Sequence, residues 1–218
     1  MSTVSVFAAL AESRILPVAV VDDRRAATPL AVALLDGGLR VAEVTLRTAV
    51  ALEVIRDMVD ADGLLVGAGT VVRPAQVEQV VEAGARFVVT PGFSASVVRE
   101  CQSLGMPVIP GIATPTELQM ALEAGLDTVK FFPAVAAGGV PMIKAMAGPY
   151  PDVRFVPTGG ITSANAADFL AVPQVLAVGG SWMVAADLLA RQPFERISAL
   201  CAEAATLAGT ARPGSGAA

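Results

Sequence analysis

The repeating unit of this chain is clearest in the stretch Pro115-Thr-Glu-Leu-Gln-Met-Ala-Leu-Glu-Ala-Gly-Leu-Asp-Thr-Val-Lys-Phe131. Residues 115–123 have helical character and begin with proline, whose missing N–H costs little in a first turn. Gly125 follows in the position of a helix C-cap. Residues 128–131 then form a short run of apolar and β-branched type, as buried strands do. The stretch therefore predicts a helix followed directly by a strand.

The same alternation runs through the whole chain. Eight apolar runs are predicted strands: Ile15–Val21, Val41–Thr45, Leu64–Gly67, Phe87–Thr90, Val108–Pro110, Thr128–Phe131, Arg154–Pro157 and Val175–Val178. The predicted helices span residues 26–36, 49–59, 74–83, 94–103, 115–123, 140–147, 163–169 and 182–205. Strands alternating with helices are typical of βαβ units around a parallel sheet. Eight such units favour an α/β fold with a single (β/α)₈ TIM barrel, and an open flavodoxin-like sheet is the alternative.

The two ends of the chain lie outside this pattern. Residues 1–14 lack the basic start and the cleavage site of an export signal, and we expect a short N-terminal helix there. The barrel domain is expected to span residues 1–207. Residues 208–218, which are rich in Gly and Ala, show no periodicity and are predicted to be a disordered tail.

Composition argues against several classes of partner. Hydrophobic residues make up 54% of the chain, but its apolar stretches, such as Ile15–Val21, are far shorter than the roughly 20 residues that cross a bilayer. The net charge is −5, and no basic run is longer than Arg24-Arg25, which argues against nucleic acid. Cys101 and Cys201 have neither metal-site spacing nor a disulfide framework. We expect a cytoplasmic protein that binds neither membrane nor nucleic acid.

The chain contains no histidine, which removes the commonest general base and the commonest metal ligand. Lysine is almost as rare, because only Lys130 and Lys144 accompany thirteen arginines. These facts predict chemistry without a metal or cofactor, and they make a lysine inside a strand conspicuous.

Lys130 lies between Val129 and Phe131 in a predicted strand. Side chains alternate along a strand, so Thr128, Lys130 and Phe132 share one face, which is the interior in a barrel. Desolvation there favours the neutral amine, which can attack a carbonyl. The alternative is a structural lysine that reaches the rim or pairs with a carboxylate.

Glu43, Thr45 and Arg47 share one face of the second predicted strand and its end. A chain without histidine needs another proton-transfer group, and the interior Glu43 is the candidate. The alternative is a structural ion pair with Lys130 or Arg47. Arg47 has a planar fork suited to a carboxylate or phosphate, unless it is only a solvated loop residue.

Two glycine pairs follow the last two predicted strands, in Thr158-Gly159-Gly160 and in Gly179-Gly180-Ser181. Loops at these places in barrels commonly bind phosphate on backbone N–H groups. Ser181 can add a hydroxyl. The alternative is that these are ordinary turn glycines.

Together these residues resemble the 2-keto-3-deoxy-6-phosphogluconate (KDPG) aldolase and 4-hydroxy-2-oxoglutarate aldolase family. The resemblance runs from about residue 15 to residue 182. The motifs that carry it are Glu43-Val-Thr-Leu-Arg-Thr48, Gly67-Ala-Gly-Thr70, Thr90-Pro-Gly92, Lys130-Phe-Phe-Pro-Ala134, Pro157-Thr-Gly-Gly160 and Gly179-Gly-Ser-Trp182.

The resemblance implies a Schiff-base aldolase in which Lys130 attacks the substrate carbonyl and Glu43 moves protons. It implies substrate contacts from Arg47 and Thr70 to the carboxylate, from Pro91, Phe132 and Thr158 around the pyruvate moiety, and from Gly159, Gly160, Gly180 and Ser181 to the phosphate. KDPG would be cleaved to pyruvate and glyceraldehyde 3-phosphate by a homotrimer without a metal. The alternatives are cleavage of the C4 epimer or of 4-hydroxy-2-oxoglutarate, a metal-dependent phosphosugar epimerase, and a non-catalytic phosphosugar-binding barrel. The missing histidines count against the epimerase.

Overall fold

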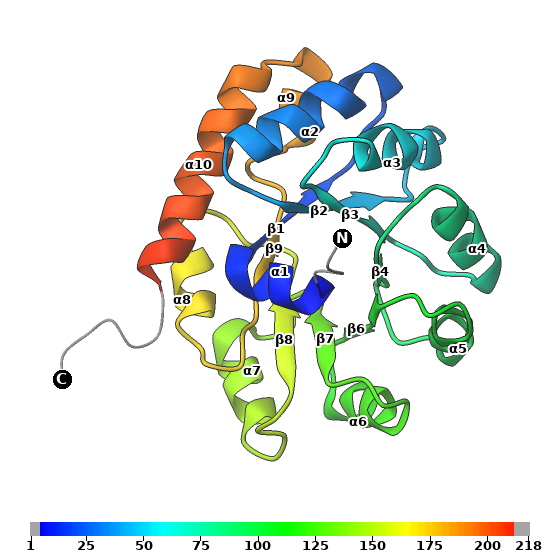
Figure 1. The fold of residues 1–218 in the computed structure, drawn as a ribbon. Coiled ribbons are helices and arrows are strands. Elements are labelled where there is room, and N and C mark those ends of the chain that lie inside the picture. Colours follow the sequence, from blue (N-terminus) through cyan, green and yellow to red (C-terminus); the bar gives the residue numbers. More distant parts are fainter. Residues whose placement is uncertain (1–4, 212–218) are drawn as a thin grey trace.

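A computed structural model describes residues 5–211 and shows helices arranged around a curled set of parallel strands (Figure 1). The strands are β1 (Ile15–Ala19), β2 (Val41–Thr45), β3 (Leu65–Gly69), β4 (Val88–Val89), β5 (Val108–Ile109), β6 (Gly111–Ile112), β7 (Thr128–Phe131), β8 (Arg154–Pro157) and β9 (Val178–Gly180). The helices are α1 (Val6–Ser13), the 3₁₀ turn η1 (Arg24–Ala26), α2 (Ala27–Asp36), α3 (Ala51–Val59), α4 (Pro74–Glu82), α5 (Ala95–Ser103), α6 (Pro115–Glu123), α7 (Gly139–Ala147), α8 (Ala166–Leu170), α9 (Ala186–Arg191) and α10 (Phe194–Thr210). The predicted alternation of strands and helices and the N-terminal helix are therefore confirmed.

The strands form two hydrogen-bonded sheets in which every pairing is parallel. One has the order β5-β4-β3-β2-β1-β9 and the other the order β6-β7-β8. Isolated bridges, Phe155 to Val175 and Thr158 to Gly179, link β8 to the β9 segment. Pro110, which has no N–H to donate, separates β5 from β6. The structure therefore shows a curled parallel α/β half-barrel, and the complete eight-stranded barrel stays a prediction.

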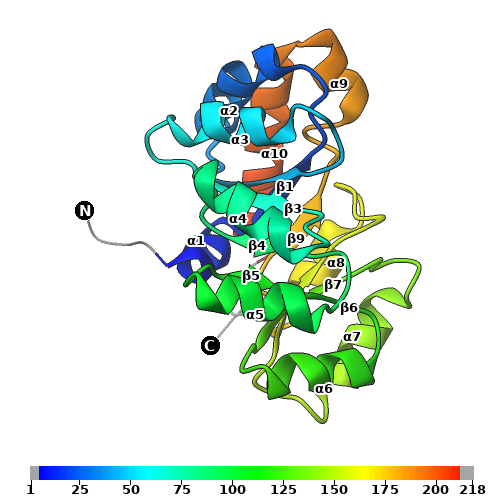
Figure 2. The same cartoon turned by 90° about the vertical axis from the view of Figure 1, so that its right-hand side faces the viewer.

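Alternation along the strands produces two separate cores. The larger core lies between strands and helices and includes Val44, Val129 and Phe131. The smaller core, on the inner face, is formed by Val6, Leu10, Leu16, Val41, Phe87, Val89, Ile109, Val156 and Ala177. Helix α1 contributes the first two of these and lies across the N-terminal end of the strands, at one edge of the turned view (Figure 2). One end of the interior is therefore filled with apolar side chains.

The C-terminal helix differs from its prediction in two ways. The single helix expected over residues 182–205 is wrong, because α9 ends at Arg191, the following residue Gln192 has a left-handed φ of 58°, and α10 begins after Pro193. A proline disfavours the α conformation in the residue before it, which explains the break. Helix α10 also extends to Thr210, beyond the predicted domain end at 207. The rest of the predicted tail, residues 212–218, lies outside the described residues.

The last strand lies further along the chain than predicted. Val175 makes one isolated bridge, whereas β9 begins at Val178 and includes Gly179 and Gly180, which pair with Leu16 and Pro17. These glycines were expected in a loop, but β1 offers them a hydrogen-bonding edge. Between residues 5 and 211, no helix combines the length and apolar character needed to cross a membrane.

Candidate active site

Lys130 and Glu43 meet in the interior although they belong to different sheets. Lys130 lies on β7 between Val129 and Phe131, which pack in the outer core, so its side chain points inward as predicted. Its Nζ atom donates to Oε1 of Glu43 on β2 at 3.3 Å. The side chains of Lys130 and Glu43 are 7% and 0% exposed. The predicted convergence of these two residues is confirmed, whereas their roles stay predictions.

The hydrogen-bonding capacity of this pair is only partly used within the protein. Oε2 of Glu43 is buried and has no hydrogen-bond partner among the described residues. The Nζ atom lies 5.3 Å from the centroid of the Phe132 ring, close enough for a cation–π contact. A buried carboxylate oxygen with no partner is unfavourable in a purely structural ion pair. The arrangement can pass a proton between an amine, a carboxylate and a third group placed beside them.

The two cysteines cannot supply a competing nucleophile. Burial raises the pKa of the Cys101 thiol to about 11 and that of the Cys201 thiol to about 12. Both thiols therefore stay protonated near neutral pH, and the thiolate is the reactive form. Cys101 lies on α5 and Cys201 on α10, in the outer helical layer. Lys130 therefore stays the candidate nucleophile of the interior.

Arg47 and Thr70 follow β2 and β3, whose ends are neighbours in the sheet. The Arg47 side chain is exposed and makes no hydrogen bond within residues 5–211. The turn that carries it is fixed by Thr48, whose hydroxyl donates to the Val21 carbonyl at 2.7 Å. Thr70 is partly buried and has a left-handed φ of 59°, which is uncommon for a residue other than glycine. Both are available to a bound anion at the C-terminal end of the strands.

The segment after β4 is held by Thr90, a residue that the sequence reasoning gave no role. Its hydroxyl donates to the Gly92 carbonyl at 2.7 Å and accepts from the Gly111 N–H at 3.1 Å. The predicted substrate residue Pro91 lies between Thr90 and Gly92, which the first of these hydrogen bonds joins, and it is partly buried. Thr90 is buried and lies at the end of a strand. A threonine at a strand end was the signal in the sequence from which this positioning role could have been predicted.

The loop after β8 needs its glycines, because Gly159 and Gly160 have φ values of 98° and 76°. Asn165 fixes this loop by accepting from the Thr162 N–H at 2.9 Å and donating to the Gly160 carbonyl at 3.1 Å. The sequence reasoning missed Asn165, although its position just before a helix is typical of a capping residue. A Cβ atom on Gly159 would lie 3.2 Å from the Phe132 ring, so this loop passes beside the residues that follow β7.

The second glycine pair differs from the first. Gly180 is buried within β9 rather than in a loop, and Ser181 follows it as an exposed residue. The bridge between Thr158 and Gly179 brings the ends of β8 and β9 together. The predicted phosphate residues therefore lie on two adjoining strand ends, although Gly180 belongs to the strand itself.

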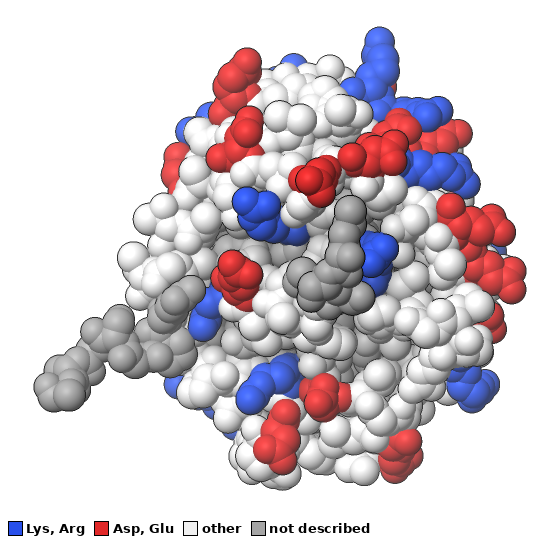
Figure 3. Space-filling view, in the orientation of Figure 1, with Lys and Arg blue, Asp and Glu red and all other residues white. Residues whose placement is uncertain are grey.

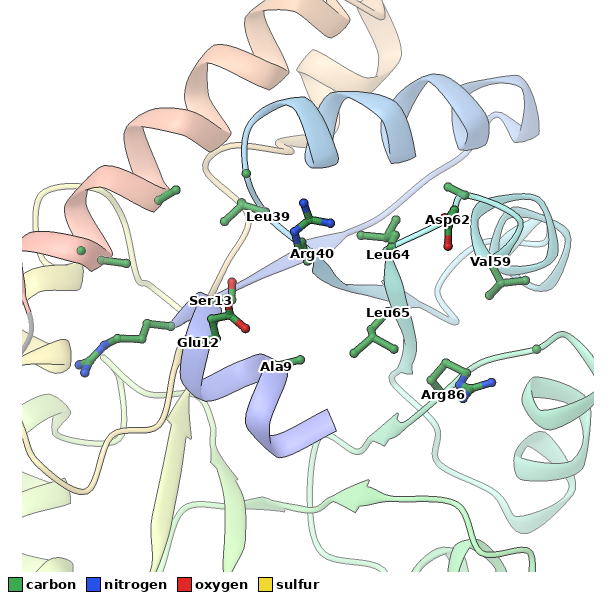
Figure 4. A pocket seen from close by; sticks show the side chains of 18 residues that line it. Ala9, Glu12, Ser13, Leu39, Arg40, Val59, Asp62, Leu64, Leu65 and Arg86 are labelled. Carbon is green, nitrogen blue, oxygen red and sulfur yellow. The ribbon is translucent and has the colours of Figure 1, made fainter. Parts of the chain in front are cut away.

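A separate hollow lies at the other end of the strands. Its volume is about 980 Å³, and it is lined at the N-terminal end of the strands by α1, the segment just before β2 and the segment around residue 62 (Figure 4). Arg40, Asp62 and Arg86 line it, and none of the predicted site residues does. Charges of both signs are scattered over this face (Figure 3). In the described part of the chain, no group of three acidic or cysteine residues is placed to hold a metal ion.

Comparison with a family model and comparison with individual known proteins indicate the same family. Residues 6–200 match the family model described as KDPG and KHG aldolase. The chain is 47% identical over 207 residues to 2-dehydro-3-deoxy-phosphogluconate aldolase of Treponema pallidum, covering 94% of this chain and 99% of that protein.

Two solved structures are similar in fold and sequence. KDPG aldolase from Legionella pneumophila, with pyruvate captured as a covalent carbinolamine intermediate, matches with a TM-score of 0.87 and 44% identity over 90% of this chain and 96% of that one. The aldolase of Zymomonas mobilis with 3-phosphoglycerate matches with a TM-score of 0.89 and 40% identity, covering 96% and 97% of the two chains.

Proposed function

Because this chain belongs to the KDPG and KHG aldolase family, and is therefore a carbon–carbon lyase, we propose that it cleaves KDPG through a Schiff base on Lys130. The products are pyruvate and glyceraldehyde 3-phosphate. The observation that carries this proposal is the buried contact of 3.3 Å between Lys130 Nζ and Glu43 Oε1. The covalent carbinolamine of the Legionella relative supports the same chemistry here.

The first stage joins Lys130 to the substrate. The neutral amine attacks C2 of the keto acid, and a proton passes from nitrogen to oxygen to give a carbinolamine. Protonated Glu43 then donates to the departing hydroxyl, so that water leaves and a positively charged iminium forms. Glu43 becomes a carboxylate in this step, and its 3.3 Å contact with the Lys130 Nζ atom supports this role.

The second stage breaks the bond between C3 and C4. The Glu43 carboxylate takes the proton of the C4 hydroxyl, the bonding pair moves toward the iminium, and glyceraldehyde 3-phosphate leaves. Glu43 returns that proton to C3 of the resulting enamine. Water then attacks C2 of the new iminium and gives one proton to Glu43, and a second carbinolamine forms. As this carbinolamine breaks down, its hydroxyl proton passes to the Lys130 nitrogen and pyruvate leaves, so that Glu43 and Lys130 return to their starting forms.

The remaining predicted residues hold the two ends of the substrate. Arg47 and Thr70 bind the carboxylate, which suits an exposed guanidinium and a hydroxyl at neighbouring strand ends. Pyruvate is enclosed by Pro91, Phe132 and Thr158, and the phosphate is bound by Gly159, Gly160, Gly180 and Ser181. The adjoining ends of β8 and β9 support this phosphate site.

A second activity, cleavage of 4-hydroxy-2-oxoglutarate to pyruvate and glyoxylate, is favoured by the matching family description, which includes KHG aldolase. That substrate has no phosphate, so it uses only the Lys130, Glu43 and Arg47 part of the site. Comparing kcat/KM for phosphorylated and unphosphorylated keto acids, including the C4 epimer of KDPG, ranks these activities.

Three further features complete the proposal: the closed barrel, the assembly and its location, and the lack of a metal or cofactor. The two sheets form one closed (β/α)₈ barrel within a single domain, which the bridges between β8 and the β9 segment support. The predicted end of this domain at residue 207 is extended by α10 to Thr210. The enzyme acts as a homotrimer, as the family resemblance implies, and in the cytoplasm, which agrees with two cysteines that have no disulfide framework. It uses neither metal nor cofactor, which agrees with a sequence that lacks histidine.

Borohydride reduction in the presence of pyruvate tests the Schiff base. We expect a stable adduct on Lys130, located by peptide mass spectrometry, and unchanged activity after treatment with a chelator. Lys144→Arg is the matched control, because Lys144 is an exposed residue of α7 and should be dispensable. An adduct confined to Lys144, or no adduct in the wild type, would contradict the proposal.

A further inference from the structure

Gly69, the last residue of β3, has no conformational reason to be glycine. Its φ does not lie in the left-handed region, so the backbone there is accessible to any L-residue. Glycine within a strand weakens it, since it adds conformational entropy to the unfolded chain and packs no side chain. The reason for glycine at this position must lie in its surroundings.

The space that a side chain of residue 69 would need is occupied by the carboxylate of Glu43. A Cβ atom on Gly69 would lie 2.0 Å from Oε1 of Glu43 and 2.6 Å from both its Cδ and Cγ atoms. These distances are far inside van der Waals contact, and they involve three atoms of Glu43 rather than a flexible tip. Alanine at position 69 and the observed Glu43 rotamer therefore exclude each other.

Neither partner can withdraw without losing other interactions. Strand β3 is paired on both sides, with Gly69 opposite Thr45 of β2 and opposite Val89 of β4. The Gly69 carbonyl also accepts from the Leu46 N–H at 2.8 Å. The backbone at Gly69 is thus fixed, so a Cβ atom there displaces the carboxylate from Lys130.

The same arrangement recurs on the other side of the interior. A Cβ atom on Gly179 of β9 would lie 2.2 Å from Oγ1 of Thr158, whose strand neighbours it. Gly179 also lacks a left-handed φ. In both places an inward polar side chain lies across the α-carbon of a glycine on the adjoining strand.

We infer that Gly69 is a positioning residue whose missing side chain lets the Glu43 carboxylate reach Lys130. The inference deepens the proposed function and rests on it for the catalytic meaning of the contact. Gly69 therefore affects turnover through the position of the carboxylate, whereas a glycine that only allowed close packing would affect stability alone.

Gly69→Ala tests this inference through two stages of the reaction. Turnover needs the carboxylate in place, whereas trapping of pyruvate depends first on the Lys130 amine. We expect kcat to fall by about 100-fold, the scale of a lost acid–base group, while borohydride trapping falls by less than about 10-fold. Gly67→Ala is the matched control on the same strand and face, because its Cβ atom would meet the Phe87 ring at 2.3 Å instead of Glu43. It should lower Tm without separating kcat from trapping.

A thermal double-mutant cycle tests the geometry independently of catalysis. We expect Gly69→Ala to lower Tm, or to prevent folding, in the wild type, and to have little effect in the Glu43→Ala background. An equal loss of Tm in both backgrounds, failure to fold in both, or equal falls in kcat and trapping would overturn the inference. If wild-type protein traps no pyruvate, the Schiff-base proposal fails, and the cycle still decides whether Gly69 makes room for Glu43.

Discussion

The interior has two layers that the same strands build but that differ in chemistry. The lower layer is the smaller apolar core at the N-terminal end of the strands, and the upper layer contains Lys130 and Glu43. Strand β2 contributes Val41 to the lower layer and Glu43, two residues later, to the upper layer. Strand β8 contributes Val156 to the lower layer, with Thr158 following on the same face. The lower layer is apolar and closed by α1, whereas the upper layer contains a buried amine and carboxylate. The apolar layer below contributes stability by burial, and the buried ionisable pair lies only at the end that carries the candidate site.

The hollow near Arg40 also differs from the upper layer, in how its charged side chains are exposed to water. Its charged side chains, such as Arg40 and Arg86, are exposed and well hydrated. The upper layer instead places two ionisable groups out of water, where their interaction is stronger. The buried pair of ionisable groups, rather than this hollow, therefore locates the candidate site.

The largest expected effect is from Lys130→Arg. Arginine keeps the positive charge but cannot form an imine, so kcat/KM for KDPG should fall on the order of 10⁴-fold or more, as on loss of other covalent nucleophiles. The measurement is a coupled assay of pyruvate release. Activity within tenfold of wild type would show that the upper layer is structural, and the comparison would fail.

Glu43→Gln should have the next largest effect. The amide is nearly isosteric but cannot accept and return a proton, so kcat should fall by about 10²- to 10⁴-fold. Borohydride trapping of pyruvate on Lys130 should persist better than turnover. Equal losses of trapping and turnover would mean that Glu43 only supports Lys130 structurally.

Phe87→Ala examines the lower layer. Phe87 is completely buried there, so the variant should lose about 3–5 kcal/mol of unfolding free energy, measured in urea. At a temperature where the variant is folded, kcat should stay within a few-fold of wild type. A loss of kcat comparable to that of Glu43→Gln would show that the two layers are not separable.

Arg40→Ala, at the hollow, should have the smallest effect. Arg40 is exposed and lies at the end of the strands opposite the candidate site. We expect kcat/KM and Tm to remain close to wild type, with kcat/KM changed by no more than about twofold. A tenfold loss of kcat/KM would give this hollow a part in the reaction.

Much of the fold and of the site could be predicted because both depend on local periodicity. Alternation around Lys130 and Glu43 placed each side chain inward, and the structure confirms that they meet. The break at Gln192 carried a signal in the sequence, because Pro193 follows it and disfavours a helical conformation there. The shift of the last strand to Val178–Gly180 could not be predicted as readily, because glycines form a strand only when a neighbouring edge is present.

The sequence by itself determined the alternation of elements, the inward face of each strand, the lack of histidine and the family motifs. These properties are local or compositional, and they need no knowledge of which strands face each other. Only the tertiary structure decided the contact across 87 residues between Glu43 and Lys130, and the need for an empty space above Gly69. Both follow from how the curled strands bring distant side chains within contact distance, and sequence spacing does not encode such distances.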